Sequence, residues 1–277
     1  AVCADSKGYI DLQATIDAPV IQFILPIPNY VIPIGAEIKL SEQKIPVNIR
    51  YKALNNWVTL GKEKYVRSLL VEVRHLQGEN LLFQLSWASD KSDNSRENLL
   101  MLDQVRLLYP STNWLARSVL LHPKSDLSNS DWYTAPQSVY ANYVTNKKLL
   151  KDKGYPPEKS SQWLFDRPQA IYQLFIMTGN SKWLDEGNLL ADFYIQNIDE
   201  NGDFKPRKKY DPKFFMPKGL LYKYFLTGDV KAKLALSKLY QRSLKWDPNY
   251  FAGRGFWTER TQAAALNPAI SSWEMTG

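Results

Sequence analysis

Two short stretches of the chain repeat a pattern of charged residues that could bind an anionic ligand. Both read acidic-Arg-x-Gln-Ala, over Asp166 to Ala170 and again over Glu259 to Ala263, and each closely follows a tryptophan, Trp163 or Trp257. Each stretch is expected to begin a helix, because a carboxylate in the first turn complements the helix dipole and Pro168 suits an early helical position. One interpretation is that each acid and its neighbouring arginine do no more than stabilise the start of a helix. Alternatively, helices that share an orientation could present Trp, carboxylate and Arg to a common cleft.

Imidazole chemistry is limited to His75 and His122, since the sequence holds two histidines. His75 follows the strand-like run 66–74, which favours a structural or surface role. His122 lies between the two predicted domains and precedes a loop that leads to Trp132 and Tyr133. His122 is therefore the better candidate for a general base, although a structural role for it remains open.

Metal and nucleotide chemistry find little support in the sequence. Asp199 begins the one-three-five spacing of a calcium loop, but Phe204 stands where that loop needs glycine, so a turn at Asn201-Gly202 is the better interpretation. P-loop, HExxH and GxSxG patterns are absent. The single cysteine, Cys3, excludes an intrachain disulfide and a multi-cysteine metal site. No metal and no cofactor is expected.

Composition indicates a globular protein with an acidic partner. The chain has 277 residues, of which 44% are hydrophobic and 23% charged, and its net charge is +7. The lysines and arginines are scattered apart from one cluster at 205–213, so nucleic acid is not expected to bind. The 13% aromatic content supplies rings that could stack on sugar faces or fill a core. Three prolines interrupt the longest apolar stretch, 20–36, and no membrane span is expected.

The N-terminal part, residues 1–112, is predicted to be a β-sandwich domain. Short runs rich in Val, Ile and Leu alternate there with Pro, Gly and Asn, which is typical of strands and turns. A polar stretch at 89–97 is predicted to be an exposed loop. The seven predicted strands are 9–16, 20–25, 37–40, 47–51, 66–75, 81–87 and 100–108.

The C-terminal part, residues 113–277, is predicted to be a repeat of helical hairpins. Thr178-Gly179, Thr227-Gly228 and Thr276-Gly277 recur at a spacing of 49 residues, and each ends an apolar or aromatic-rich helix. Glycine in the left-handed conformation would close one helix, and the Asn or Asp that follows the first two copies would cap the next. The predicted helices are 131–149, 163–178, 181–197, 213–227, 230–245 and 258–276, with another near 113–120.

The predicted fold is therefore multidomain α and β, with an N-terminal β-sandwich followed by an α/α-hairpin repeat. Such repeats stack as an open solenoid or close into an α/α toroid, and a partial toroid is expected. Gly277 stands where the earlier copies begin their second helix. The natural protein is therefore expected to continue past this point.

The layout resembles that of bacterial rhamnogalacturonan-lyase-like proteins, in which a β-sandwich precedes an α/α toroid. Three segments look like that sandwich: 18–28, Ile45-Pro46-Val47 and 66–73. The segment that runs from Trp163-Leu164-Phe165-Asp166-Arg167 through Thr178-Gly179 to Lys182-Trp183-Leu184 looks like the hairpins of the toroid. The resemblance implies cleavage of an acidic polysaccharide by β-elimination, which suits the basic charge.

A lyase of this kind must neutralise the uronate carboxylate, remove the C5 proton and protonate the leaving oxygen. By residue type, the candidates are Arg167 or Arg260 for neutralisation, His122 or Tyr133 for the base, and Tyr140 or Tyr143 for the acid. The expected substrate-binding residues are Trp132, Trp163, Asp166, Trp257 and Glu259. The implied partner is an acidic polysaccharide or oligosaccharide, and the implied location is periplasmic or extracellular.

Two alternatives remain open from the sequence. A toroidal glycoside hydrolase would use two carboxylates, such as Asp166 and Glu259, on either side of the scissile bond, and would give no unsaturated product. A non-catalytic glycan-binding scaffold would offer only an aromatic groove and would bind without turnover.

Overall fold

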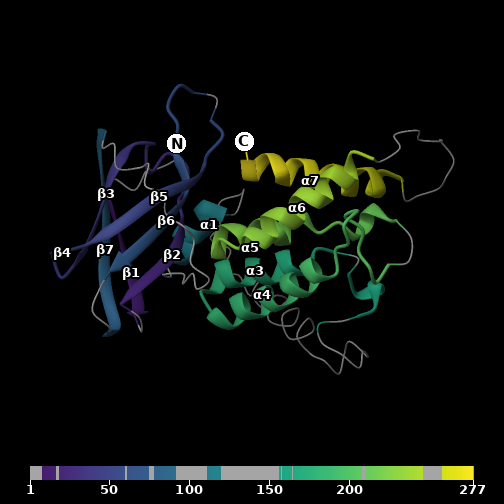
Figure 1. Cartoon of the computed structure of the whole chain (residues 1–277), viewed down its shortest axis with the longest axis horizontal. Helices are drawn as coiled ribbons and strands as arrows, with labels where there is room; N and C mark the ends of the chain where they lie inside the picture. The colour runs from purple at the N-terminus through teal and green to yellow at the C-terminus, as the bar shows by residue number, and fades with distance from the viewer. Residues whose placement is uncertain are drawn as a thin grey trace, which may run out of the picture. The chain divides into compact units, whose positions relative to one another are not determined.

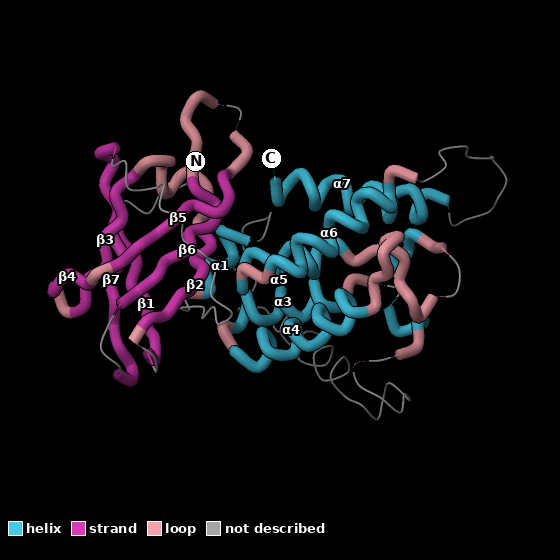
Figure 2. Tube along the Cα trace, viewed as in Figure 1, coloured by secondary structure: helices cyan, strands magenta, loops and turns pink. Residues whose placement is uncertain are grey.

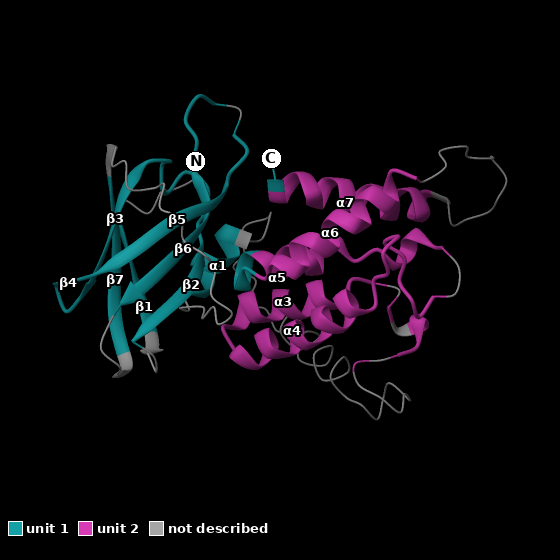
Figure 3. Cartoon of the chain, in the orientation of Figure 1, with its two compact units in different colours: residues 1–123, 225–228, 276–277 teal, residues 124–224, 229–275 magenta. Residues whose placement is uncertain are grey.

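The computed structural model of the chain describes residues 8–16, 19–59, 61–74, 78–91, 111–119, 156, 158–163, 165–207, 210–245 and 258–276 (Figure 1). The chain divides into two compact units (Figure 3). Unit 1 comprises residues 1–123, 225–228 and 276–277, and unit 2 comprises residues 124–224 and 229–275.

Unit 1 is built on two antiparallel sheets (Figure 2). One sheet has the strand order β1-β7-β3-β4 and the other the order β2-β6-β5. The strands are β1 (Tyr9–Ile16), β2 (Val20–Pro26), β3 (Ala36–Glu42), β4 (Ile45–Val47), β5 (Ile49–Asn56), β6 (Val66–Arg74) and β7 (Gly78–Lys91). The predicted strand at 100–108 lies outside the described residues, and so does His75.

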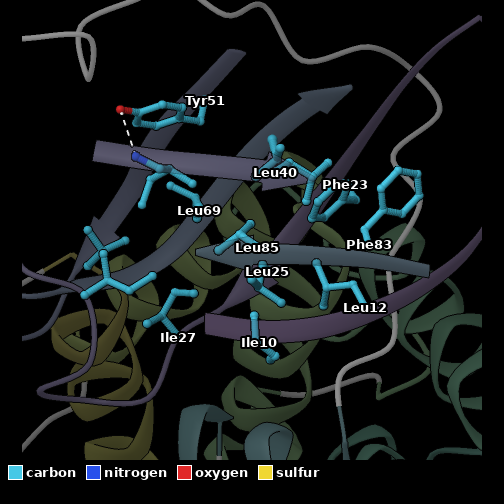
Figure 4. Close-up of a cluster of buried hydrophobic side chains, with 14 of the residues drawn as sticks. Ile10, Leu12, Phe23, Leu25, Ile27, Leu40, Tyr51, Leu69, Phe83 and Leu85 are labelled. Atoms are coloured by element: carbon cyan, nitrogen blue, oxygen red, sulfur yellow. Dashed lines mark hydrogen bonds between the residues drawn. The ribbon is translucent and has the colours of Figure 1, made fainter. Parts of the chain in front are cut away.

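An apolar core draws side chains from both sheets (Figure 4). Phe23 and Leu25 of β2 have no exposed surface, and neither does Leu85 of β7 in the other sheet. Burial of each such side chain contributes about 1.5–3 kcal/mol. The backbone N–H of Ile38 in β3 donates to the Tyr51 hydroxyl of β5 at 3.3 Å, so one hydrogen bond also links the two sheets.

The helix α1 (Thr112–Val119) packs its tryptophan into the same core. The Trp114 indole N–H donates to the carbonyl oxygen of Pro26 at 2.7 Å, and the ring lies 6.3 Å from that of Trp87. The hydrogen bond satisfies a carbonyl at the last residue of β2. This helix corresponds to the one predicted near 113–120.

After α1 the described part of the chain is mainly helical, and the first two hairpin corners have the geometry that the repeat predicted. Gly179 and Gly228 adopt left-handed φ angles of 70° and 71°. The Asn180 side chain then accepts from Lys182 N, and Asp229 accepts from Lys231 N. The helices are α3 (Arg167–Thr178), α4 (Ser181–Gln196), α5 (Pro217–Thr227), α6 (Val230–Ser243) and α7 (Thr258–Thr276), with short 3-10 turns η3 (Ser160–Trp163) and η4 (Pro212–Phe214).

The predicted fold class, with its partial α/α toroid, is wrong. The described part of the chain contains six α-helices beside seven strands in two antiparallel sheets, a mixed α/β class, and no long helical toroid is present among those residues. The repeat specifies how each helix ends and the next begins, but it does not specify the angle between successive hairpins. Ring closure depends on that angle. The predicted helix at 131–149 lies outside the described residues.

Among the helices described here, none is long and apolar enough to cross a bilayer.

The hairpin of α3 and α4 depends on a close contact between a tyrosine and a glycine. Tyr172 of α3 has no exposed surface, and its hydroxyl donates to Asn188 Oδ1 at 2.9 Å. A Cβ added to Gly187 of α4 would lie 2.7 Å from Cε1 of the tyrosine ring. The ring therefore occupies the space that any side chain at position 187 would need.

We expect the substitution Gly187→Val to destabilise the protein by about 1–3 kcal/mol, because the added atoms overpack a buried ring. Urea unfolding followed by circular dichroism measures this change. The matched control is Gly61→Val, since a Cβ at Gly61 meets nothing within 4 Å. Equal stability of the two variants would contradict the proposed contact.

Candidate functional site

The carboxyl group of Asp166 joins the N-terminal ends of two helices. Asp166 is the N-cap of α3: its Oδ1 accepts from the backbone N–H of Gln169 at 3.0 Å. Its Oδ2 accepts from the N–H of Gly219 in the first turn of α5 at 2.9 Å. A Cβ on Gly219 would lie 2.6 Å from Asp166 Oδ1 and 2.7 Å from Pro168 Cβ. The junction therefore requires glycine at position 219.

Helix α7 contacts the same junction at two places. Lys218, which precedes Gly219, places its ammonium 2.5 Å from Oε1 of Glu274, and the Glu274 side chain is buried. At the other end of α7, the guanidinium of Arg260 lies 5.0 Å from the centroid of the Phe165 ring, within the range of a cation–π interaction. Phe165 immediately precedes Asp166 and is 75% exposed. The junction thus has an exposed aromatic ring with a guanidinium beside it.

The electrostatics of the junction favour a proton on the Asp166 carboxyl. The N-terminal ends of α3 and α5 carry partial positive charge. Burial raises the pKa of the Asp166 carboxyl from 3.8 to about 6, although the N–H groups of Gly219, Gln169 and Lys218 and the Lys218 charge act to lower that pKa. The Asp166 carboxyl therefore titrates in the weakly acidic range.

The predicted site residues within the described part of the chain differ in their burial and in their contacts. Trp163 has no exposed surface and stacks on Phe193 at 5.4 Å, so its indole offers no face to a sugar in this structure. Arg167 is partly buried at the start of α3, and Glu259 is exposed in the first turn of α7. The two copies of the acidic-Arg pattern meet at one place. Arg260 of the second copy lies beside the ring of Phe165, which precedes Asp166 of the first copy.

Several candidates from the sequence cannot be placed. The predicted site residues that lie outside the described part of the chain are His122, Trp132, Tyr133, Tyr140, Tyr143 and Trp257. Their roles stay predictions.

Sequence reasoning missed Phe165, Lys218, Gly219 and Glu274. A signal for one of them was present: Gly219 lies in the first turn of a helix, where glycine is less favourable than most residues by several tenths of a kcal/mol up to about 1 kcal/mol. A glycine in that place often indicates a close packing contact. No comparable signal marks Glu274, whose partner lies 56 residues away in the chain.

The Asp199 loop is a turn, as the sequence predicted. Asp199 Oδ1 accepts from the N–H groups of Asn201 and Asp203, each at 2.9 Å, and Gly202 has a φ of 88°. Among the residues that the structure describes, no group of three or more His, Cys, Asp or Glu side chains could hold a metal ion.

A second polar site lies in unit 1, at the ends of β5 and β6. A cavity of about 290 Å³ is lined by Asn48, Ile49, Arg50 and Arg74. Both guanidinium groups lie near the same oxygen of the buried Glu72, at 3.6 and 3.5 Å. The Glu72 carboxylate therefore holds both guanidinium groups beside the cavity.

The raised pKa of Asp166 predicts a pH dependence of stability. Between about pH 4 and pH 6 the unfolded chain loses the Asp166 proton while the folded chain keeps it, so the free energy of unfolding falls as pH rises. The fall from this group amounts to at most about 3 kcal/mol, and it disappears in Asp166→Asn. Urea unfolding of both proteins at pH 4 and pH 6.5 measures the difference. The control is Asp185→Asn, at an exposed position of α4. If Asp166→Asn kept the pH dependence of the original protein, the raised pKa would not belong to Asp166.

Comparisons of the chain with protein-family models, with curated proteins and with solved structures found no match. The resemblance to rhamnogalacturonan-lyase-like proteins therefore stays a prediction.

Proposed function

We propose that this protein binds an acidic polysaccharide outside the cytoplasm, in the periplasm or extracellularly, and cleaves it as a polysaccharide lyase. The observation that carries the proposal is the Arg260 guanidinium, 5.0 Å from the centroid of the exposed Phe165 ring beside the Asp166 junction. A guanidinium binds a carboxylate through paired hydrogen bonds, and an aromatic face packs against the apolar face of a sugar. A uronate presents both of these features to a protein.

In the proposed reaction Arg260 neutralises the uronate carboxylate, which makes the C5 proton more acidic. A base then takes that proton, the C4–O bond breaks, a double bond forms between C4 and C5, and an acid protonates the leaving oxygen. His122 or Tyr133 is the proposed base and Tyr140 or Tyr143 the proposed acid. Arg167 is the alternative to Arg260 for neutralisation.

The hydrolase alternative finds less support at the junction. Both oxygens of Asp166 accept backbone N–H groups, and these bonds hold its carboxyl between two helices. A hydrolase would need that carboxyl to face a glycosidic bond. The Asp166 and Glu259 pair is therefore not favoured.

A non-catalytic glycan-binding protein is the second candidate function. The cavity beside Arg50 and Arg74 in unit 1 favours it, because guanidinium groups beside a cavity suit an anionic sugar without any catalytic group. Glu72 would orient both arginines in this role.

Incubation of the protein with a panel of acidic polysaccharides, followed by ultraviolet absorbance of the new double bond, tests the lyase proposal. We expect product with at least one uronate polymer, and a loss of rate by about 10²–10³-fold in Arg260→Ala, since one charged stabiliser of the developing negative charge is removed. The matched control is Arg207→Ala. Arg207 also lies over a phenyl ring, that of Phe214, at 5.6 Å, so the control removes the same kind of pair elsewhere in unit 2.

Binding measured with the same panel separates the two candidate functions. Binding without product, weakened in Arg50→Ala but not in Arg260→Ala, would assign the protein to the glycan-binding class and contradict the lyase proposal. An absence of both binding and product would contradict both candidates.

A further inference from the structure

Helix α6 carries a row of lysines on its exposed side (Figure 1). Lys231, Lys238 and Lys245, called the lysine row below, are all exposed and follow one another at intervals of seven residues. Seven residues bring an α-helix to within about 20° of two full turns, so these side chains lie nearly in line. Each interval advances about 10.5 Å along the helix axis. The last lysine continues the line because the N–H of Leu244 still donates to the carbonyl oxygen of Tyr240.

The lysine row has no acidic side chain beside it in its own segment. Residues 230–245 contain five lysines and arginines and neither Asp nor Glu. An acid is present at each end of α6, but each pairs with a cation outside the row. Asp229 lies 3.5 Å from the ammonium of Lys223, and Asp203 lies 2.8 Å from Arg242. Among the residues that the structure describes, the row lysines form no ion pair.

The stability of α6 does not account for the lysine row. Lys231 lies in the first turn of the helix, where the positive end of the helix dipole disfavours a cation. Lys238 lies four residues before Arg242, and like charges at this spacing destabilise a helix. The side of α6 that holds it in the protein is formed by Ala232, Ala235, Leu236, Leu239 and Ser243, which are buried. An anionic ligand at the exposed side would account for the row.

We propose that the lysine row binds a linear acidic polysaccharide, which lies along α6 with its anionic groups beside the three ammonium groups. This inference rests on the acidic polysaccharide of the proposed function and adds a binding surface to Arg260. Cations in a line suit a chain whose charges are also in a line. The interval of the row is that of every second ring in an extended 1,4-linked sugar chain. Gln241, exposed between Lys238 and Lys245, can bond to sugar hydroxyls through its amide.

Other anionic partners fit the lysine row less well. A bilayer takes up the apolar face of an amphipathic helix, but the apolar face of α6 is buried in the protein. Duplex DNA carries one charge per about 1.7 Å of its axis, a much denser array than the row. Single-stranded nucleic acid needs aromatic rings on which its bases stack. The residues between the lysines along the line are Leu234 and Gln241, neither of which is aromatic.

Replacement of all three row lysines in the full chain tests the proposal. The row variant carries Lys231→Gln, Lys238→Gln and Lys245→Gln, because glutamine has nearly the helix propensity of lysine. Its affinity for polygalacturonate and polymannuronate, two linear 1,4-linked uronate polymers, is measured by isothermal titration calorimetry over a range of salt concentrations. Urea unfolding of the same variant checks that α6 still folds.

The matched control removes three positive charges from unit 1. It carries Lys44→Gln, Lys62→Gln and Lys64→Gln, at three exposed positions. Both variants therefore have the same net charge, and a difference between them reports where the charge lies. A uronate disaccharide serves as a second control, because it is too short to span the row.

We expect the row variant to bind the polymers about tenfold more weakly than the original protein, because three exposed ion pairs with the polymer are lost. Its affinity should also depend less on salt, since fewer charges meet the polyanion. The control variant should bind within about twofold of the original protein, because screening weakens the effect of distant charges. The disaccharide should bind equally to both variants, and the row variant should be as stable as the original protein.

The outcomes separate this inference from the lyase proposal. Polymer binding that is equal in the row variant and the control variant would overturn the inference alone. Lysine-dependent binding without a new double bond would support the inference and contradict the lyase proposal. Binding of neither polymer would overturn the inference, and binding of duplex DNA or of phosphatidylglycerol vesicles in their place would identify the other partner class.

Discussion

The Asp166 carboxyl is the group on which the helical unit depends. A helix begins with backbone N–H groups that have no partner within the helix, and here one side chain accepts from two helices, at Gln169 of α3 and Gly219 of α5. The absence of a side chain at Gly219 permits this approach. Because Lys218 precedes that glycine, its ammonium reaches Glu274, and α7 is joined to the same junction.

The charged groups at the junction have different surroundings. Asp166 and Glu274 point inward and are held by hydrogen bonds, and burial raises the pKa of the Asp166 carboxyl. Arg260 instead lies on an exposed phenyl ring. Asp166 and Arg260 belong to the two copies of the acidic-Arg pattern in the sequence. The acid of the first copy accepts hydrogen bonds at two helix starts, while the arginine of the second copy lies beside an exposed ring. The structural interpretation of the pattern therefore holds for Asp166, and the functional interpretation stays a prediction.

The strands of unit 1 were largely predictable because short runs rich in Val, Ile and Leu are separated there by Pro, Gly and Asn. The division of one predicted strand was not. The run 47–51 is split at Asn48 between β4 and β5, which belong to different sheets. Gln43 and Lys44 make the turn before β4 with left-handed φ angles of 47° and 71°, although residues of these types rarely mark such a turn.

The sequence by itself determined the helix corners, the turn at Asn201-Gly202 and most strand positions, since these depend on hydrogen bonds and φ angles within a few residues. Only the tertiary structure decided that Trp163 is buried against Phe193, that Glu274 meets Lys218 and that the predicted toroid is absent from the described residues. Those outcomes depend on how side chains far apart in the chain fill space together. The 49-residue repeat records where each helix ends, whereas packing between the hairpins determines where the next helix lies.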